Sequence, residues 1–305
     1  MSDPSHQGAA LDDLPTLGLL TGISYVSGLD YYRHINENFD AAAQARGFIG
    51  LVMAPNPQMV LVSVNCDRYA SSLIAADWDT VHAYLLQAVA RLVAAGAEVL
   101  CIASNTGHIA AERIAAAHPS LPLLHIADCI ARHARARGWR RLGLLGTAIT
   151  MQQPFLQARL ARHGLDITVP AAAVDQERLF RIIMEDLSRG RFPREARVFI
   201  ARVVRDLAAR GVEAVILGCT ELELLVEGTE GDSGTGADQS QDAEGDIANE
   251  RDGGERADRR QTSSDGIDMV LPLLPSGRLH MDAAVRVAAG LDTVADYLPH
   301  TQQDR

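Results

Sequence analysis

The chain has 305 residues, of which 47% are apolar and 22% charged, so it is long enough to bury the cores of two compact lobes. Its net charge of -11 argues against nucleic-acid binding, which needs clustered basic side chains. The sequence has no apolar run of about 20 residues to span a membrane, no signal-peptide pattern at its start and no CxxC pair among its four cysteines. We therefore expect a protein of the reducing cytoplasm that has no membrane partner.

All 28 basic residues are arginine. Pyridoxal-phosphate enzymes need a lysine for the Schiff base, and Walker-type loops need one for the phosphates, so both classes are excluded. The ten histidines show no HxH, HExxH or Cys/His ligand spacing, and the glycine-rich turns do not form GxGxxG. We therefore expect no metal and no organic cofactor.

After an N-terminus (residues 1–15) expected to be disordered, short apolar runs alternate with segments of helical period, a pattern typical of βα units on a mainly parallel sheet. Strands are expected at Leu17–Leu20, Met59–Val64, Val99–Ala103, Leu123–Ile126, Leu142–Leu145 and Ala214–Leu217. Helices are expected at Gly28–Arg46, Thr80–Ala95, Ile109–Ala117, Met151–His163, Arg178–Ser188 and Ala196–Arg210. The fold class is therefore α/β.

An internal repeat indicates two related lobes. The segment from Leu17 to Gly22 resembles that from Leu142 to Thr147, and the segment from Leu92 to Glu98 resembles that from Leu207 to Glu213. The second pair is offset by 115 residues, which places Ser104 opposite Cys219.

The repeat predicts two pseudo-symmetric lobes, each a mainly parallel four-stranded sheet flanked by helices, with the active site in the cleft between them. Lobe 1 is expected over 16–118, completed by a C-terminal helix at 278–298, and lobe 2 over 119–226, with a tail at 299–305. Residues 227–268 hold 13 Asp or Glu against 4 Arg and few bulky apolar residues, so they are expected to be an acidic, disordered surface insertion.

Two predicted strand ends carry side chains suited to proton transfer. The first reads Ala103-Ser-Asn-Thr-Gly-His108, and the second reads Leu217-Gly-Cys-Thr-Glu-Leu222. The helix that follows each strand would present free N–H donors and the positive end of its dipole. Such a setting favours a thiolate at Cys219 and a bound carboxylate beside it.

These motifs resemble the NT-A-H and GCTE elements of the aspartate/glutamate racemase superfamily. The supporting matches are Ser24, the segment from Asp30 to Arg33, Asn65, the segment from Leu144 to Thr147 with Thr150 and Met151, and Leu279 with His280. The resemblance spans about Leu17 to Leu291 without the acidic segment. It implies a cofactor-independent amino-acid racemase acting on aspartate, glutamate or a similar small acid, and a homodimer by family analogy.

In the mechanism that the resemblance implies, one cysteine from each lobe faces the substrate α-carbon; one removes the α-proton and the other returns a proton from the far side. The catalytic residues carried over are Cys219, Ser104 and His108. The substrate-binding residues carried over are Ser24, Asn65, Asn105, Thr106, Thr147, Thr220 and Glu221.

The chain departs from this pattern because Ser104 occupies the first cysteine position, and a hydroxyl is a much weaker acid than a thiol. Three hypotheses follow. The enzyme handles one enantiomer well and the other poorly, with Ser104 relaying a proton through His108 or water. Cys219 acts alone as a proton donor, as in arylmalonate decarboxylases, or in a maleate-isomerase-like enzyme. The chain is a non-catalytic carboxylate-binding protein. We favour the first.

Other single residues are open to two interpretations. Cys101 and Cys129 fit structural positions, whereas Cys66 follows a strand end and could replace the missing thiol. Arg68 is the one arginine near a predicted strand end of lobe 1 and could pair with a substrate carboxylate. The segment from Leu274 to His280 lacks the Asp-Thr pair usual in the family, which puts its part in substrate binding in doubt.

Overall fold

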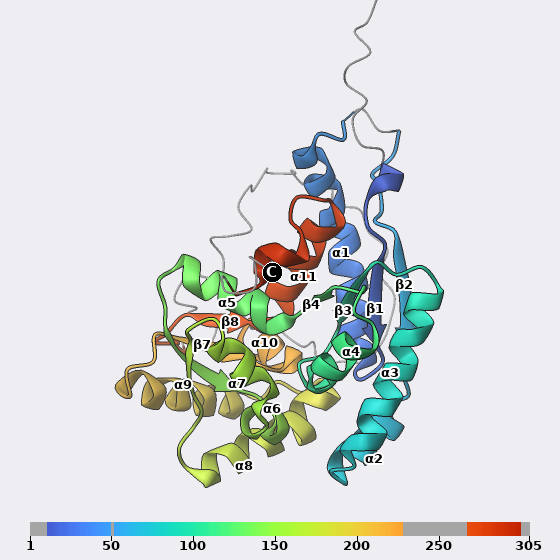
Figure 1. Cartoon of the computed structure of the whole chain (residues 1–305). Helices are drawn as coiled ribbons and strands as arrows, with labels where there is room; N and C mark the ends of the chain where they lie inside the picture. Colours follow the sequence, from blue (N-terminus) through green and yellow to red (C-terminus); the bar gives the residue numbers. More distant parts are fainter. Residues whose placement is uncertain (1–10, 50–51, 228–266, 300–305) are drawn as a thin grey trace, which may run out of the picture.

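The computed structural model describes residues 11–49, 52–227 and 267–299. Within them, eight strands form two parallel four-stranded sheets, one in each lobe (Figure 1). The first sheet contains β1 (Leu17–Thr21), β2 (Met59–Ser63), β3 (Val99–Ile102) and β4 (Leu123–Leu124). The second contains β5 (Arg141–Leu145), β6 (Asp166–Thr168), β7 (Ala214–Leu217) and β8 (Leu273–Pro275). The predicted fold class is confirmed.

The two sheets have the same topology. Their strand orders are β2-β1-β3-β4 and β6-β5-β7-β8, and every pair is parallel. Both bounds of β7 lie 115 residues after those of β3, the offset read from the sequence repeat. Residues at equal distances beyond β3 and β7 therefore occupy equivalent places in the two lobes.

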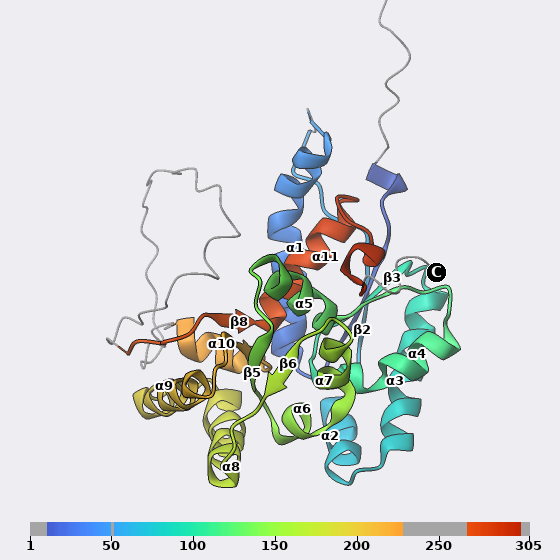
Figure 2. The same ribbon diagram turned by 60° about the vertical axis from the view of Figure 1, so that its left-hand side comes forward.

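Each sheet is covered by helices. These are α1 (Tyr25–Arg46), α2 (Cys66–Ile74), α3 (Trp78–Ala94), α4 (Ala111–Ala117), α5 (Ile126–Ala136), α6 (Ala148–Gln152), α7 (Pro154–Ala161), α8 (Ala173–Arg181), α9 (Arg194–Ala209), α10 (Thr220–Glu227) and α11 (Ser276–Ala288). Figure 2 shows α8 and α9 on the outer side of the second sheet. None of the described helices is both long and apolar enough to cross a membrane.

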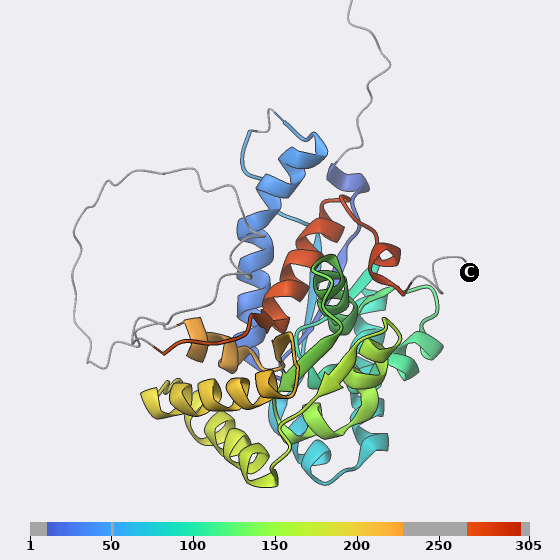
Figure 3. The ribbon, with the colours of Figure 1, turned by 90° about the vertical axis from the view of Figure 1, so that its left-hand side faces the viewer.

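The period-two alternation of side chains divides the core of the first lobe. Leu17 and Leu19 pack with α1 and α11 on one face of the sheet, whereas Leu20 packs with α3 on the other. The red α11 lies between α1 and α5 in Figures 1 and 3, so the C-terminal helix covers the first lobe although β8, which precedes it, belongs to the second sheet. The chain thus crosses back between the lobes at Pro275 and Ser276.

Several expected boundaries differ from the structure. The predicted helix at Met151–His163 is two helices, because Gln153 is extended before Pro154, as residues before proline usually are. The predicted helix at Arg178–Ser188 begins earlier, as α8, and continues through a π turn at Ile182–Asp186. The strands β6 and β8 were not predicted because each is only three residues long. The helices α2 and α5 were also not among the predicted elements.

The lobe boundaries also differ from expectation. The strand β4 pairs with β3 in the first sheet, although it lies beyond the predicted boundary at residue 118. The predicted helix at 278–298 ends as α11 at Ala288, and a 3₁₀ turn follows at Val294–Tyr297. Within the N-terminal segment expected to be disordered, Leu11–Asp13 forms a 3₁₀ turn. The remainder of that segment (1–10), most of the acidic insertion (228–266) and most of the tail (300–305) lie outside the described residues.

Candidate functional site

Ser104 and Cys219 line the same cavity. Each stands two residues beyond its strand, at the carboxyl ends of β3 and β7, and the cavity between them measures about 90 Å³. Eight of the ten predicted site residues line it: Ser24, Ser104, Asn105, Thr106, Thr147, Cys219, Thr220 and Glu221. Asn65 and His108 do not. The cavity is thus built from equivalent strand ends, with a hydroxyl contributed by one lobe and a thiol by the other.

The thiol of Cys219 is held in its protonated form by Glu221. The Cys219 Sγ–H donates to Glu221 Oε2 at 2.8 Å, and the Thr220 hydroxyl donates to the same oxygen at 3.0 Å. Burial, and then the negative charge of Glu221, raise the pKa of the Cys219 thiol well above its usual value. The expectation that the start of the helix would favour a thiolate does not fit this arrangement, because burial and then the carboxylate next to sulfur outweigh the helix dipole.

Ser104 has no acidic partner of this kind among the described residues. Its Oγ lies 3.1 Å from Thr106 Oγ1 and accepts the Gly107 N–H at 3.4 Å. Both contacts come from the 3₁₀ turn Thr106–Ala110, which begins directly after the strand end. The two sides of the cavity are therefore chemically unequal: a thiol coupled to a carboxylate faces a hydroxyl coupled to a second hydroxyl.

His108 lies behind the strand end and forms hydrogen bonds to backbone groups. Its Nδ1–H donates to the Ser104 carbonyl at 2.8 Å, and its Nε2 accepts the Ile126 N–H at 3.3 Å. Burial, and then the nearby His280, lower the pKa of His108 to about 3, so the ring is neutral. Because both ring nitrogens are engaged and His108 does not line the cavity, the predicted proton relay from Ser104 through His108 does not fit this geometry.

The side chains predicted beside β2 also have other partners. The Asn65 side chain caps α2 by accepting the Arg68 N–H at 2.9 Å, and the Arg68 guanidinium stacks on Tyr84 at 4.5 Å. The Cys66 thiol donates to the Ile23 carbonyl at 3.0 Å and does not line the cavity. The structure thus brings neither Arg68 nor the alternative thiol to Ser104 and Cys219.

Contacts between the lobes close the cavity, and the sequence analysis did not assign them. Ser27 Oγ on α1 lies 3.0 Å from Thr220 Oγ1 on α10. The Asn105 Nδ2 donates at 2.8 Å to Ser276 Oγ, which itself donates to the Leu217 carbonyl at 2.7 Å. A signal for Ser27 was available, because it stands one helical turn after Ser24 and so shares its face.

Two further features complete the cavity. Asn105 is 7% exposed, and its Oδ1 accepts no hydrogen bond from any described residue, so a free acceptor is available to a ligand. Thr147 caps α6, and its hydroxyl lies 3.1 Å from that of Thr150. The described residues contain no group of three or more His, Cys, Asp or Glu placed to hold a metal ion. The arrangement offers one thiol, one carboxylate and several neutral donors and acceptors.

Comparisons with known proteins agree with this architecture. Residues 20–236 match the model of the Asp/Glu/hydantoin racemase family. A structure from Yersinia pestis described as a "putative Asp/Glu Racemase" is 32% identical, with a TM-score of 0.69 over 90% of this chain and 99% of that one. A structure of an aspartate racemase homologue from Pyrococcus horikoshii OT3 is 25% identical, with a TM-score of 0.63 over 90% and 100% of the two chains. The aspartate racemase of Picrophilus torridus, 15% identical with a TM-score of 0.56 over 90% and 94%, shares the fold.

Proposed function

This chain belongs to the Asp/Glu/hydantoin racemase family, and we propose that it racemises a small α-amino acid without a cofactor, by proton transfer at the α-carbon between Cys219 and Ser104. The observation that carries the proposal is that these two side chains end equivalent strands of the two lobes and line one cavity. Aspartate, glutamate or a similar small acid is the proposed substrate, because the related structures are described as Asp/Glu or aspartate racemases. The cavity of about 90 Å³ suits a small molecule.

Glu221 supplies the acid/base partner that Cys219 needs. When Cys219 acts as the base, its S–H proton passes to Glu221, and the resulting thiolate takes the α-proton of the substrate. The electron pair left on the α-carbon spreads into the substrate carboxylate, which the hydroxyl and backbone donors around the cavity stabilise. When Cys219 acts as the acid, its proton goes to the α-carbon, and Glu221 then helps to restore the thiol.

Ser104 acts from the other lobe, and chemistry makes it a better proton donor than base. Its hydroxyl can protonate a carbanion, and the alkoxide that remains takes the proton of the Thr106 hydroxyl, 3.1 Å away, which Thr106 then regains from water. Removing an α-proton with Ser104 would require that alkoxide to form first, which is costly because a hydroxyl is a much weaker acid than a thiol. The relay therefore runs through Thr106, in place of the route through His108 expected from the sequence.

The substrate ammonium has a partner in the same cavity. Asn105 Oδ1 is buried and accepts no hydrogen bond from the described residues, so it can accept one from an α-ammonium group. Its Nδ2 is fixed by Ser276, which holds the amide in this orientation. Ser24 and Thr147 are then the side chains whose hydroxyls bind the substrate carboxylates, whereas the Thr220 hydroxyl donates to Glu221 and orients it.

A second candidate function is favoured by the protonated state of Cys219. A thiol held as S–H by burial and by Glu221 is suited to one-sided proton donation. In a decarboxylase of the arylmalonate type, the bond from the α-carbon to a carboxylate breaks, carbon dioxide leaves, and the electron pair on the α-carbon takes the Cys219 proton. This reaction needs no base at Ser104.

Proton NMR in deuterated water separates the two functions. Each enantiomer of aspartate and glutamate is incubated with the enzyme, and both the loss of the α-hydrogen signal and the change of optical rotation are followed. A racemase gives exchange and inversion, both lost in Cys219→Ala and both retained in Cys66→Ala, which removes an exposed thiol outside the cavity. Carbon dioxide release from a substituted malonate without exchange of any amino acid favours the decarboxylase. Exchange that persists in Cys219→Ala would contradict both.

A further inference from the structure

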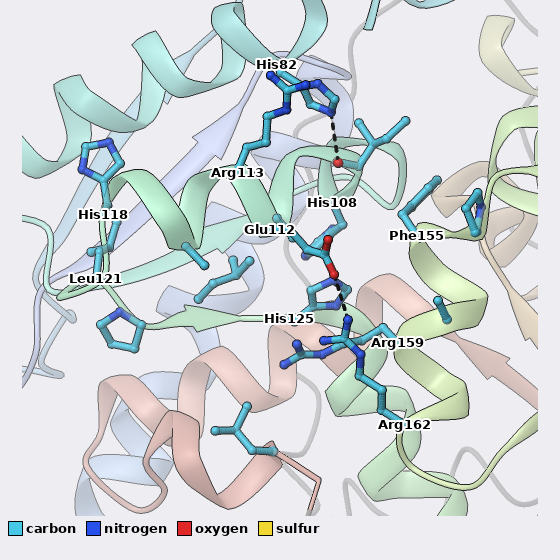
Figure 4. A pocket seen from close by; sticks show the side chains of 18 of the residues that line it. His82, His108, Glu112, Arg113, His118, Leu121, His125, Phe155, Arg159 and Arg162 are labelled. Atoms are coloured by element: carbon cyan, nitrogen blue, oxygen red, sulfur yellow. Dashed lines mark hydrogen bonds and ion pairs between the residues drawn. The ribbon is translucent and has the colours of Figure 1, made fainter. Parts of the chain in front are cut away.

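A second, larger cavity lies between the lobes and shares no lining residue with the first. It measures about 820 Å³ and opens between α4 of the first lobe and α7 of the second (Figure 4). We propose that this cavity binds an amphipathic anion, a ligand with an apolar or aromatic body and one carboxylate, sulfonate or phosphate group. The proposal is independent of the reaction at Cys219.

The charged side chains around this cavity are mainly basic. Arg113, Arg159 and Arg162 line it with Glu112 as the single carboxylate among the described lining residues. Arg159 is committed to the buried carboxylate of Asp128, to which it donates two hydrogen bonds, at 2.8 and 2.7 Å. The other two guanidiniums are therefore the ones that a ligand can recruit.

Arg113 and Arg162 have only weak partners. The Arg113 side chain is 57% exposed and lies 3.3 Å from Asp79, whose side chain is 88% exposed. Figure 4 shows Glu112 on α4 reaching to Arg162, the residue directly after α7. The two side chains lie 2.8 Å apart and are 83% and 43% exposed. Exposed pairs of this kind contribute little free energy, so an anion at either guanidinium, Arg113 beside His82 or Arg162 beside Arg159 (Figure 4), would replace the present partner at small cost.

Uncharged donors and apolar walls complete the lining. His125 uses Nδ1 to accept the Ala127 N–H at 3.1 Å, so its ring hydrogen is on Nε2, and no described residue accepts it. His82 also lines the cavity, but its Nε2–H donates to the Ile109 carbonyl at 3.3 Å, so His125 is the histidine that offers a donor here. Apolar walls are supplied by Trp78, Leu121, Pro122, Phe155 and Leu298. A few polar groups among aromatic and aliphatic walls are the usual composition of a site for an organic ligand, and the volume of about 820 Å³ is within the usual range of about 300–1,000 Å³.

The place of the cavity means that an occupant touches both lobes. The Glu112–Arg162 pair already spans them, and His108, which holds the Ser104 carbonyl, forms part of the wall. A ligand bound here would stabilise the present arrangement of the lobes, because it binds the folded chain and not the unfolded one. Binding is therefore expected to raise Tm.

The test compares two fluorescent probes of nearly equal shape. One is the anion 8-anilinonaphthalene-1-sulfonate, and the other is uncharged N-phenyl-1-naphthylamine. We expect the sulfonate to saturate at one molecule per folded chain, with an affinity about tenfold or more above that of the neutral probe. Equal affinity of the two probes would overturn the proposed recognition of an anion.

Variants place the bound probe. Arg113→Gln with Arg162→Gln should weaken sulfonate binding about tenfold and leave the neutral probe unchanged, whereas Arg91→Gln with Arg205→Gln, at exposed positions on α3 and α9, should change neither. Ala158→Trp, which fills the cavity from α7 without changing charge, should abolish binding of both. Cys219→Ala, in the smaller cavity, should retain sulfonate binding. Sulfonate binding that survives Ala158→Trp would overturn the assignment to this cavity.

Discussion

The proton on Cys219 is shared with a carboxylate two residues further along the chain, and this pairing gives the site its chemical character. Burial and Glu221 both oppose the thiolate, so the pKa of Cys219 is raised. Glu221→Gln removes the charge and keeps a side-chain oxygen that can accept the S–H. We expect the pKa of Cys219 to fall in this variant, while the rate of α-hydrogen exchange falls roughly 100-fold for want of a proton acceptor.

The thiolate absorbance near 240 nm, followed against pH, measures this change. Cys66 is an exposed thiol outside the cavity, so both proteins carry Cys66→Ser to remove its absorbance. Burial raises the pKa of Cys101 to about 12 and raises that of Cys129 well above its usual value, as it does for Cys219, so the Cys219 signal is read as the difference from the same protein carrying Cys219→Ala. A Cys219 midpoint that stays in place or moves to higher pH in Glu221→Gln would show that Glu221 does not hold the thiol proton.

A second prediction for a single residue concerns Ser104. Because the two enantiomers have equal free energies, kcat/KM for racemisation must be equal in the two directions. An inequality between the two acid/base groups therefore appears elsewhere, as exchange of the α-hydrogen with solvent that is not accompanied by inversion. The enantiomer whose α-hydrogen faces Cys219 should exchange faster than it inverts. Ser104→Cys supplies a stronger acid and base, and should raise inversion at least about tenfold and bring the two rates together. Inversion that is unchanged or slower in a folded Ser104→Cys protein would remove Ser104 from the mechanism.

The contacts between side chains were easier to predict from the sequence than the protonation states of those side chains. A fixed offset between two repeats is enough to give Ser104 and Cys219 equivalent places, because β3 and β7 are equivalent strands of two lobes whose strand ends share one cavity. The state of the thiol depends on where the Glu221 carboxylate turns, and the orientation of His108 depends on the Ile126 amide of another element. Neither contact has a signal in local sequence.

At the scale of elements, the central strands of each lobe were predictable and the edges were not. The buried runs of β3 and β7 have apolar side chains on both faces, and the predicted bounds of β7 agree with the structure. The edge strand β6 has three partly exposed residues and begins with Asp166, so no apolar run marks it. Helices were predicted best where their period was long and uninterrupted, as in α9.

The repeated glycines of β1 and β5 test the packing of equivalent elements. A Cβ added at Gly18 would lie 2.6 Å from the Cβ of Ala97, an atom that no side-chain rotation can move. At Gly143 the nearest atom would be a terminal methyl of Leu207 at 2.9 Å, which can rotate away. We expect Gly18→Ala to lower the free energy of unfolding by about 1–3 kcal/mol and Gly143→Ala to lower it by less, as measured by urea unfolding. The reverse order would contradict this difference in packing.

At the scale of the whole molecule, buried neutral histidines lie where the lobes and the returning helix meet. The rings of His108 and His125 have centroids 4.4 Å apart, and those of His108 and His280 lie 5.7 Å apart. His280 donates from Nε2 to the Leu124 carbonyl and accepts from the Tyr31 hydroxyl, both at 2.8 Å, which joins α11 to β4 and α1. Burial lowers the pKa of His280 to about 4, as it lowers that of His108 to about 3.

These histidines should make the fold sensitive to mild acid. In the unfolded chain they bind protons below about pH 6.5, whereas the folded chain resists protonation until about pH 4. The unfolded state therefore holds more protons in this window, and the free energy of unfolding falls as pH falls, by up to about 1.4 kcal/mol per pH unit for each histidine. The buried Asp128, whose pKa is lowered chiefly by the Arg159 and His163 hydrogen bonds against the cost of burial, adds to the loss below about pH 4.

Urea unfolding at intervals between pH 7 and pH 4.5 measures this slope before the carboxylates contribute. His280→Gln retains a donor for the Leu124 carbonyl and an acceptor for the Tyr31 hydroxyl. Because this variant has one titrating histidine fewer, the dependence of the unfolding free energy on pH should decrease by at most about 1.4 kcal/mol per pH unit. His118→Gln, at a half-exposed position at the end of α4, should leave the slope unchanged. The contradicting result is an unfolding free energy of the wild-type protein that does not change across this range. It would show that the histidines between the lobes titrate in the folded state as they do in the unfolded chain. The junction of the lobes would then be open to water.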